Sequence, residues 1–249
     1  RTGFSGEKLL NTAKWDQMAP FNKYTPNKYP VGCAATAGAI VMQYHGYPAK
    51  GTGSHSYKWD GKTLTAQFEH EYDWANMPAR YDGTNAADFD GVARLMSDLG
   101  VAVDMQYAED GSGSYISDLV AAMQKYFGYS KISHQMSIEA GSAEEWNEKL
   151  RGEIDANRPV LYAAFDSIGG GHAFVIDGYK DDSFSVNWGW GGLCNGFYHI
   201  GALNPQNEEG KPVASRYNVG QMAVFGMEPS DGKEKISDMR FTKMTDYLQ

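Results

Sequence analysis

The stretch of sequence that decides the fold is VGCAATAGAIVMQYHGYP, residues 31–48. Its apolar residues run nearly all the way round a helix, so it predicts a buried central helix over residues 33–45. Pro30 lies just before that helix, and Gly46 and Pro48 end it, because Gly suits the left-handed cap and Pro cannot continue a helix. The fold is therefore expected to be organised around this helix.

Cys33 would be the first residue of that helix. Free N–H groups and the helix dipole favour an anion at this place, and the thiolate is the nucleophilic form of cysteine. The alternative is a buried structural cysteine, which is common. With Cys194, the chain has two cysteines, which allows one disulfide, two buried thiols, or one reactive thiol and a bystander. We expect Cys194 to be the bystander.

The rest of the chain is helical first and rich in strands later. Pro20, Pro26 and Pro30 make residues 1–30 an extended, turn-rich entry, and residues 49–85 are expected to be loop-like. Apolar spacing predicts further helices over residues 87–99, 115–127 and 142–156, and β-branched and aromatic runs predict strands over residues 160–165, 173–179, 184–188, 197–200 and 222–227. This segregation favours an α+β fold over alternating β-α-β units.

His172 is the candidate base. It follows the glycine run Gly169–Gly171 and opens the strand HAFVIDGY. Glycines leave the imidazole uncrowded, and the backbone of Gly170 and Gly171 could pair with an extended peptide. The alternative is a histidine that merely ends a strand.

The segment after His172 supplies a candidate for orienting it. A hairpin folded about residues 177–182 would place Asn187 opposite His172, so that the Asn187 side-chain carbonyl could accept a hydrogen bond from the imidazole. Trp188 or Trp190 would then shield that bond from water. The alternative is that residues 187–190 form a core-packing turn.

Gln17 is the candidate for stabilising an oxyanion. Its side-chain N–H₂, together with the backbone N–H of Cys33, would form the pair of donors that such an anion needs. The alternative is an ordinary solvated glutamine.

Composition excludes several classes of function. The 249 residues carry a net charge of −9 with scattered Lys and Arg, which is not the basic patch of a nucleic-acid binder. No run reaches the roughly 18 apolar residues of a membrane span. The histidines show no zinc spacing, and no glycine-rich phosphate loop is present, so neither metal nor cofactor is predicted.

Separated motifs, in order along the chain, resemble the streptopain family of papain-like cysteine peptidases. They are LLNT with WDQ in residues 9–17, VGCAATA with MQYHGYP in residues 31–48, GGHAFVIDGY at 170–179, VNWGWGG at 186–192 and NGFY at 195–198. The similarity spans about residues 9–227.

The resemblance implies a papain-like fold with two lobes and a cleft between them. The catalytic domain would be residues 1–227, with a helical lobe over roughly 1–157 and a β-rich lobe over roughly 158–227, followed by a tail or linker over 228–249. It also implies a secreted bacterial enzyme made as a zymogen, whose N-terminal prodomain blocks the site. The absence of an initial Met fits a processed form.

The family roles agree with the residue-level interpretation. The resemblance gives Cys33 as nucleophile, His172 as base, Gln17 as oxyanion donor, and Asn187 with Trp188 as the region that orients and covers the histidine. Polypeptides are the expected substrates. Three alternatives stay open: an acyltransferase or transglutaminase using the same dyad, a catalytically silent binding relative, and a metal hydrolase.

Overall fold

The computed structural model describes residues 3–232, and its elements combine helices with antiparallel sheet. The α-helices of this part are α1 Cys33–His45, α2 Asp90–Ala102, α3 Ile116–Tyr126 and α4 Ala143–Asp155. Its strands are β1 Glu7–Leu9, β2 Ser54–Trp59, β3 Lys62–Gln67, β4 His134–Ser137, β5 Val160–Phe165, β6 Gly171–Lys180, β7 Ser183–Asn187, β8 Gly196–Tyr198 and β9 Val219–Phe225. The prediction of an α+β fold is confirmed.

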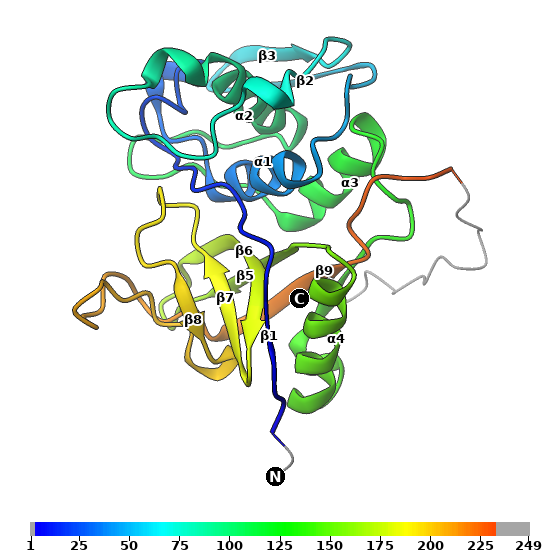
Figure 1. The fold of residues 1–249 in the computed structure, drawn as a ribbon. Helices are drawn as coiled ribbons and strands as arrows, with labels where there is room; N and C mark the ends of the chain where they lie inside the picture. The colour runs from blue at the N-terminus through cyan, green and yellow to red at the C-terminus, as the bar shows by residue number, and fades with distance from the viewer. Residues whose placement is uncertain (1–2, 233–249) are drawn as a thin grey trace.

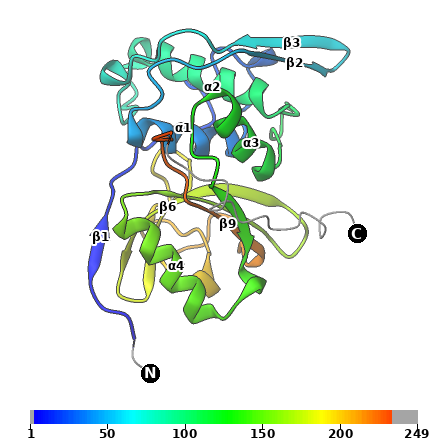
Figure 2. The same cartoon turned by 90° about the vertical axis from the view of Figure 1, so that its right-hand side faces the viewer.

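The elements are arranged in two lobes, seen one above the other in Figure 1. Helices α1, α2 and α3 and the β2–β3 hairpin form one lobe, and the large sheet with α4 forms the other (Figure 2). The sheet has the order β4-β9-β5-β6-β7-β8, with β1 added to β6, and all its pairs are antiparallel. Helix α1 packs against β5 and β6, so its start meets the strand that carries His172.

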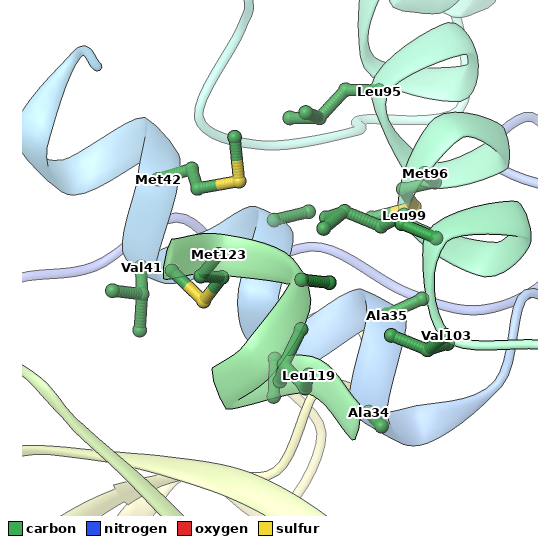
Figure 3. Packing of buried hydrophobic residues seen from close by; sticks show 14 of the residues in the cluster. Ala34, Ala35, Val41, Met42, Leu95, Met96, Leu99, Val103, Leu119 and Met123 are labelled. Carbon is green, nitrogen blue, oxygen red and sulfur yellow. The ribbon is translucent and has the colours of Figure 1, made fainter. Parts of the chain in front are cut away.

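Helix α1 has the limits that the sequence predicts. It begins at Cys33 and ends at His45, where Gly46 adopts the left-handed conformation with φ of 57°. Residues 34–42 are all buried, and Figure 3 shows Val41 and Met42 near Met123 of α3. Gly38 permits this packing, since a Cβ there would lie only 2.7 Å from a methyl group of Leu119. Small residues thus allow α1 to be enclosed on all sides.

The other predicted helices are confirmed with shifted ends. Ser142 caps α4 in the capping box with Glu145 that the sequence indicates. Helix α2, however, runs through Gly100 to Ala102. Gly100 is needed for packing inside the helix, because a Cβ there would collide with the Tyr107 hydroxyl.

The prediction of a loop over residues 49–85 is wrong in part. Strands β2 and β3 form a regular antiparallel hairpin inside this segment. Its two-residue turn is Asp60-Gly61, both with positive φ, of 46° and 72°. Asp-Gly between strand-like residues is a strong hairpin signal, and it was present in the sequence.

The predicted lobe boundary near residue 157 is also wrong. Helix α4 packs on the sheet rather than on the helical lobe, and its Trp146, Leu150 and Ile154 belong to the hydrophobic cluster of the sheet. Strands β1 and β4 likewise join the sheet. The lobes therefore separate between α3 and β4, and the chain that follows β1 crosses from the sheet to the helical lobe.

The predicted start of the C-terminal tail, at residue 228, lies too early in the chain. Ser130 donates its backbone N–H to the carbonyl of Glu228 at 2.8 Å, and Ser230 donates to that of Gly128 at 3.0 Å. Residues 228–230 are thus fastened to the body of the protein. Residues 233–249 lie outside the described residues.

Candidate active site

Cys33 lies at the first position of α1, where the two lobes meet. The Cys33 residue as a whole is partly exposed, and it forms no disulfide. Burial raises the pKa of the Cys33 thiol, while backbone hydrogen bonds from Ala173, Ala34 and Cys33 itself oppose that rise. Because Ala173 directly follows His172, the bond between Cys33 and Ala173 joins the helix to the strand that carries the imidazole.

The turn before Cys33 can be built only with glycine. Gly32 has φ of 95° and ψ of 137°, a conformation that residues with a Cβ rarely adopt. A Cβ at Gly32 would lie 2.5 Å from the Met105 sulfur and 3.2 Å from the Ser112 carbonyl oxygen. The Ser112 hydroxyl also donates to the Pro30 carbonyl at 2.6 Å. The segment of Met105 and Ser112 therefore determines where α1 begins.

Gly32→Ala is expected to lower both stability and activity. Strain at positive φ and the contact with Met105 together should cost about 1–3 kcal/mol of unfolding free energy and displace Cys33 from its partners. Urea unfolding would measure the stability, and hydrolysis of the peptides that the sequence analysis expects as substrates would measure the activity. Gly53→Ala is the matched control, since Gly53 also has positive φ but nothing within 4 Å of its Cβ position. A Gly32→Ala enzyme with full activity would contradict this account.

His172 is buried, with 7% of its surface exposed. Its Nε2 lies 2.8 Å from the Trp188 carbonyl oxygen. A carbonyl can only accept, so Nε2 carries the proton and Nδ1 keeps the free lone pair. Burial lowers the pKa of His172 to about 4, although the Trp188 carbonyl works in the opposite direction. The structure therefore holds a neutral imidazole with its basic nitrogen defined.

Aromatic rings surround this imidazole. The Trp190 ring stacks on it with centroids 4.8 Å apart and planes 25° apart. Phe174 and Trp188 lie at 5.8 and 6.1 Å, and Tyr217 lies at 5.3 Å. Trp188 is fully buried, and its indole N–H donates to the Cys194 carbonyl at 3.0 Å. Trp188 and Trp190 thus lie against the imidazole itself.

The predicted contact between Asn187 and His172 is wrong. Asn187 pairs with Val175 rather than His172, because the tight turn lies at Asp181-Asp182, further along the chain than predicted. The Asn187 side-chain oxygen instead accepts the N–H of Gly189 at 3.2 Å. The backbone carbonyl of Trp188 takes the orienting position.

Asn187 still belongs to the framework of the site. Its side-chain amide donates to the Thr12 hydroxyl at 2.9 Å and to the Ala13 carbonyl at 2.8 Å. Thr12 in turn donates its hydroxyl to the Asp177 carboxylate at 2.6 Å. This buried network joins the entry segment to the turn of Trp188. Sequence reasoning missed it, since its members are far apart along the chain.

Gln17 lies beside the start of α1. Its backbone carbonyl accepts the N–H of Val31 at 2.9 Å, and its own N–H donates to the Asp16 carboxylate at 2.6 Å. Gln17 is partly exposed.

Gly170 and Gly171 are exposed at the start of β6, next to His172. The Asp166 carboxylate holds the turn that leads into these glycines, because it accepts the N–H of Gly170 at 2.8 Å and that of Ile168 at 2.9 Å. Cys194, by contrast, is buried without a disulfide, and burial raises its pKa. In the described residues 3–232, no group of acidic, His or Cys side chains could hold a metal ion, and no helix is long and apolar enough to cross a membrane.

Acid should destabilise the folded protein through its buried histidines. Burial lowers the pKa of both His172 and His45 to about 4, from 6.5. Between these pH values the unfolded chain binds the protons and the folded chain does not, so stability falls as the pH falls. Each histidine should remove up to about 3 kcal/mol of unfolding free energy.

Urea unfolding between pH 7 and pH 4 would test this. His45→Gln should flatten the curve by about half, because one of the two histidines no longer titrates. Equal slopes with and without His45→Gln would contradict the assignment.

Comparison with known proteins identifies the family. A family model described as Peptidase C10 matches residues 15–198. The chain belongs to the Peptidase C10 family. It is 35% identical over 209 residues to streptopain of Streptococcus pyogenes, which covers 80% of this chain and 52% of streptopain. It is 33% identical over 241 residues to the thiol protease/hemagglutinin PrtT of Porphyromonas gingivalis, which covers 92% of this chain and 28% of PrtT. The chain therefore spans about half or less of these relatives.

Solved structures agree with this membership. Active wild-type interpain A cysteine protease of Prevotella intermedia matches with a TM-score of 0.80 and 36% identity, over 90% of this chain and 96% of that one. A mutant fragment of prointerpain A from the same organism matches with a TM-score of 0.77 and 33% identity, over 92% and 74% of the two chains. The predicted resemblance to streptopain-like cysteine peptidases is confirmed.

Proposed function

We propose that this chain is a cysteine endopeptidase that cleaves polypeptides with Cys33 as nucleophile and His172 as base. The observation that carries the proposal is the junction of α1 with β6, where the Cys33 thiol meets the backbone of Ala173 beside an imidazole whose tautomer is fixed. Family membership supports it, because the relatives are named thiol and cysteine proteases.

The chemistry follows from the protonation states. The Cys33 thiol passes its proton to Nδ1 of His172 as the sulfur attacks the peptide carbonyl, and the carbonyl oxygen becomes an oxyanion. His172 then returns the proton to the leaving amine, the C–N bond breaks, and a thioester remains. Water, losing a proton to His172, cleaves the thioester and regenerates the thiol.

Burial modifies the resting state expected for such a dyad. It raises the pKa of Cys33 and lowers that of His172, so burial favours the neutral thiol and the neutral imidazole. A thiolate–imidazolium pair must then be stabilised by the attraction between its members and by the backbone hydrogen bonds at the helix start.

Other parts of the site receive proposed roles. Gln17 and the Cys33 N–H would hold the oxyanion. Asn187 and Trp188 would position His172, the first through the turn and the second through its carbonyl. Gly170 and Gly171 would pair with an extended substrate, and Trp190 would line the site while covering the imidazole.

We extend the proposal to the synthesis, maturation and secretion of the enzyme. Synthesis as a zymogen with an inhibitory N-terminal prodomain is supported by the similarity to a prointerpain A fragment. Secretion is supported by the resemblance to the streptopain family. The prodomain would then be a partner of the same site before maturation.

Hydrolysis of a fluorogenic peptide under reducing conditions, before and after one equivalent of iodoacetamide, tests the function. Peptide mapping would locate the label. Activity lost together with labelling of Cys33 supports the proposal, and activity that survives full labelling of Cys33 refutes it. Products that form only with an added amine would indicate an acyltransferase instead, and inhibition by chelators a metal hydrolase.

Replacing Gln17 by alanine should lower kcat by about 10²–10³-fold, because one oxyanion donor is lost. KM should change little, since the donor acts mainly on the transition state. Steady-state kinetics with the fluorogenic peptide would measure both constants. Gln43→Ala, on the far half of α1, is the control and should leave both unchanged. An unchanged kcat in Gln17→Ala would remove Gln17 from the mechanism.

A further inference from the structure

Tyr217 lies on the connection between β8 and β9, which is closed on itself by hydrogen bonds and packs on the hydrophobic cluster of the sheet through the buried Leu203. The Tyr217 N–H donates to the Leu203 carbonyl at 3.0 Å, and the Leu203 N–H donates to the Asn218 side chain at 3.1 Å. The Asn218 amide also donates to the Gly201 carbonyl at 3.2 Å. Tyr217 is thus held at a defined place although it comes from a long connection.

Its ring contacts the imidazole of His172. The two centroids are 5.3 Å apart, with planes inclined by 37°. Tyr217 also meets the Trp188 ring at 5.9 Å, whereas the described ring contacts include none between Tyr217 and Trp190. Tyr217 and Trp190 therefore contact different parts of the imidazole.

The Tyr217 hydroxyl stays neutral beside the nucleophile. Burial raises the pKa of this phenol first, and the nearby Asp166 and Cys33 raise it further. No hydrogen bond from this hydroxyl to another described residue is found. The contribution of Tyr217 to the site of the free protein is thus made by its ring.

Asp166 links the β8–β9 connection, which carries Tyr217, to the start of the strand that carries His172. Its carboxylate accepts the N–H of Gly170 at 2.8 Å and a hydrogen bond from the Ser215 side chain. The glycine run that leads into His172 and the segment that carries Tyr217 are therefore fastened to one carboxylate, which sets the ring and the imidazole relative to each other.

We propose that Tyr217 is a positioning residue for the peptidase chemistry: its ring holds the His172 imidazole in the orientation in which Nε2 meets the Trp188 carbonyl and Nδ1 stays free to take the Cys33 proton. The proposal rests on the function proposed above. The bond to the Trp188 carbonyl fixes one nitrogen but leaves the ring free to tilt about that point. Contacts with Trp190 and Tyr217 on different parts of the imidazole prevent the tilt.

Loss of the ring should slow proton transfer without weakening substrate binding. Misplacement of a catalytic group by about 1 Å can cost roughly 10²-fold in rate, so Tyr217→Ala is expected to lower kcat by roughly 10–100-fold. The rate of Cys33 alkylation by iodoacetamide at pH 6 should fall by a similar factor, and KM should stay within about threefold. Tyr217→Phe keeps the ring and should retain kcat within about threefold.

The test compares four variants under reducing conditions. Tyr217→Ala and Tyr217→Leu remove the ring, and the second keeps apolar bulk if the first does not fold. Tyr217→Phe is the conservative rescue. Tyr81→Ala is the matched control, because Tyr81 is also a partly buried tyrosine with two ring contacts, but in the helical lobe. Tyr81→Ala should leave the alkylation rate unchanged.

The outcomes separate this inference from the proposed function. If Cys33→Ala abolishes activity but Tyr217→Leu keeps the native kcat and alkylation rate, the positioning role is overturned and the function stands. If Tyr217→Phe is as impaired as Tyr217→Leu, a role of the ring is likewise overturned. Activity that does not depend on Cys33 would overturn the function itself.

A spectroscopic readout does not depend on turnover. In the Cys33→Ala background, an NMR titration of His172 with and without Tyr217→Leu compares the imidazole directly. Burial lowers the pKa of His172 to about 4, and uncovering the ring should raise it toward 6.5. A pKa that does not move would show that Tyr217 does not cover the imidazole and would overturn the inference.

Discussion

Replacing Cys33 by alanine is expected to lower kcat/KM for peptide hydrolysis by at least about 10⁴-fold, because no other group can form the thioester. The fold should survive, since alanine suits the first turn of α1 and Cys33 forms no disulfide. Steady-state kinetics, with circular dichroism to verify folding, would measure the change.

Cys194→Ala is the matched control. Cys194 is the other free thiol, and it is buried in a turn with a raised pKa. Because its carbonyl, not its sulfur, accepts the hydrogen bonds of Trp188 and Tyr198, the variant should keep its activity. If Cys33→Ala retained activity while Cys194→Ala lost it, the assignment of the nucleophile would be reversed.

Patterns local in the sequence predicted the helices well. Pro30 before the helix and Gly46 and Pro48 after it predicted the limits of α1, and the pair Ser142 and Glu145 predicted the start of α4. These signals act within one or two turns of chain, so no tertiary information is needed. The Asp-Gly turn of the β2–β3 hairpin is equally local, and it was overlooked among aromatic and polar neighbours.

Features that depend on register could not be predicted in the same way. The hairpin turns at Asp181-Asp182, further along the chain than predicted, and this places Asn187 opposite Val175, although a bulge between Ile176 and Gly178 moves its partner toward His172. Sequence signals place neither the turn nor the bulge with single-residue accuracy. A backbone carbonyl, that of Trp188, then takes the orienting position. Since every residue has a carbonyl, such a partner leaves no mark in the sequence.

Contacts between residues that lie far apart in the sequence could not be predicted either. Tyr217 meets His172 from 45 residues further along the chain (217 − 172 = 45), through a connection without a repeating pattern. Thr12 reaches Asn187 in the same manner. The sequence could therefore name the nucleophile and the base, whose neighbours form motifs, but not the residues that hold the base in place.

His172→Ala should be nearly as damaging as the loss of the nucleophile. Without the imidazole, the thiol has no base, and burial holds the pKa of Cys33 above its ordinary value. We expect kcat/KM to fall by at least about 10⁴-fold. Alkylation of Cys33 should also become slow at pH 6 and rise only at alkaline pH, as for an unassisted thiol. Alkylation rates between pH 5 and pH 10, followed by mass spectrometry, would show both effects.

His45→Ala provides the control for losing a buried histidine. Burial lowers the pKa of His45 to about 4, as for His172, but its ring contacts Tyr129 at the other end of α1. The His45→Ala substitution should lower stability and leave the pH dependence of Cys33 alkylation unchanged. Added imidazole should restore part of the activity of His172→Ala, because it can occupy the emptied space beside Trp190 and accept the proton. If His172→Ala kept the native alkylation profile, the thiol would draw its reactivity from the helix start alone, and His172 would lose its role as the base that activates Cys33.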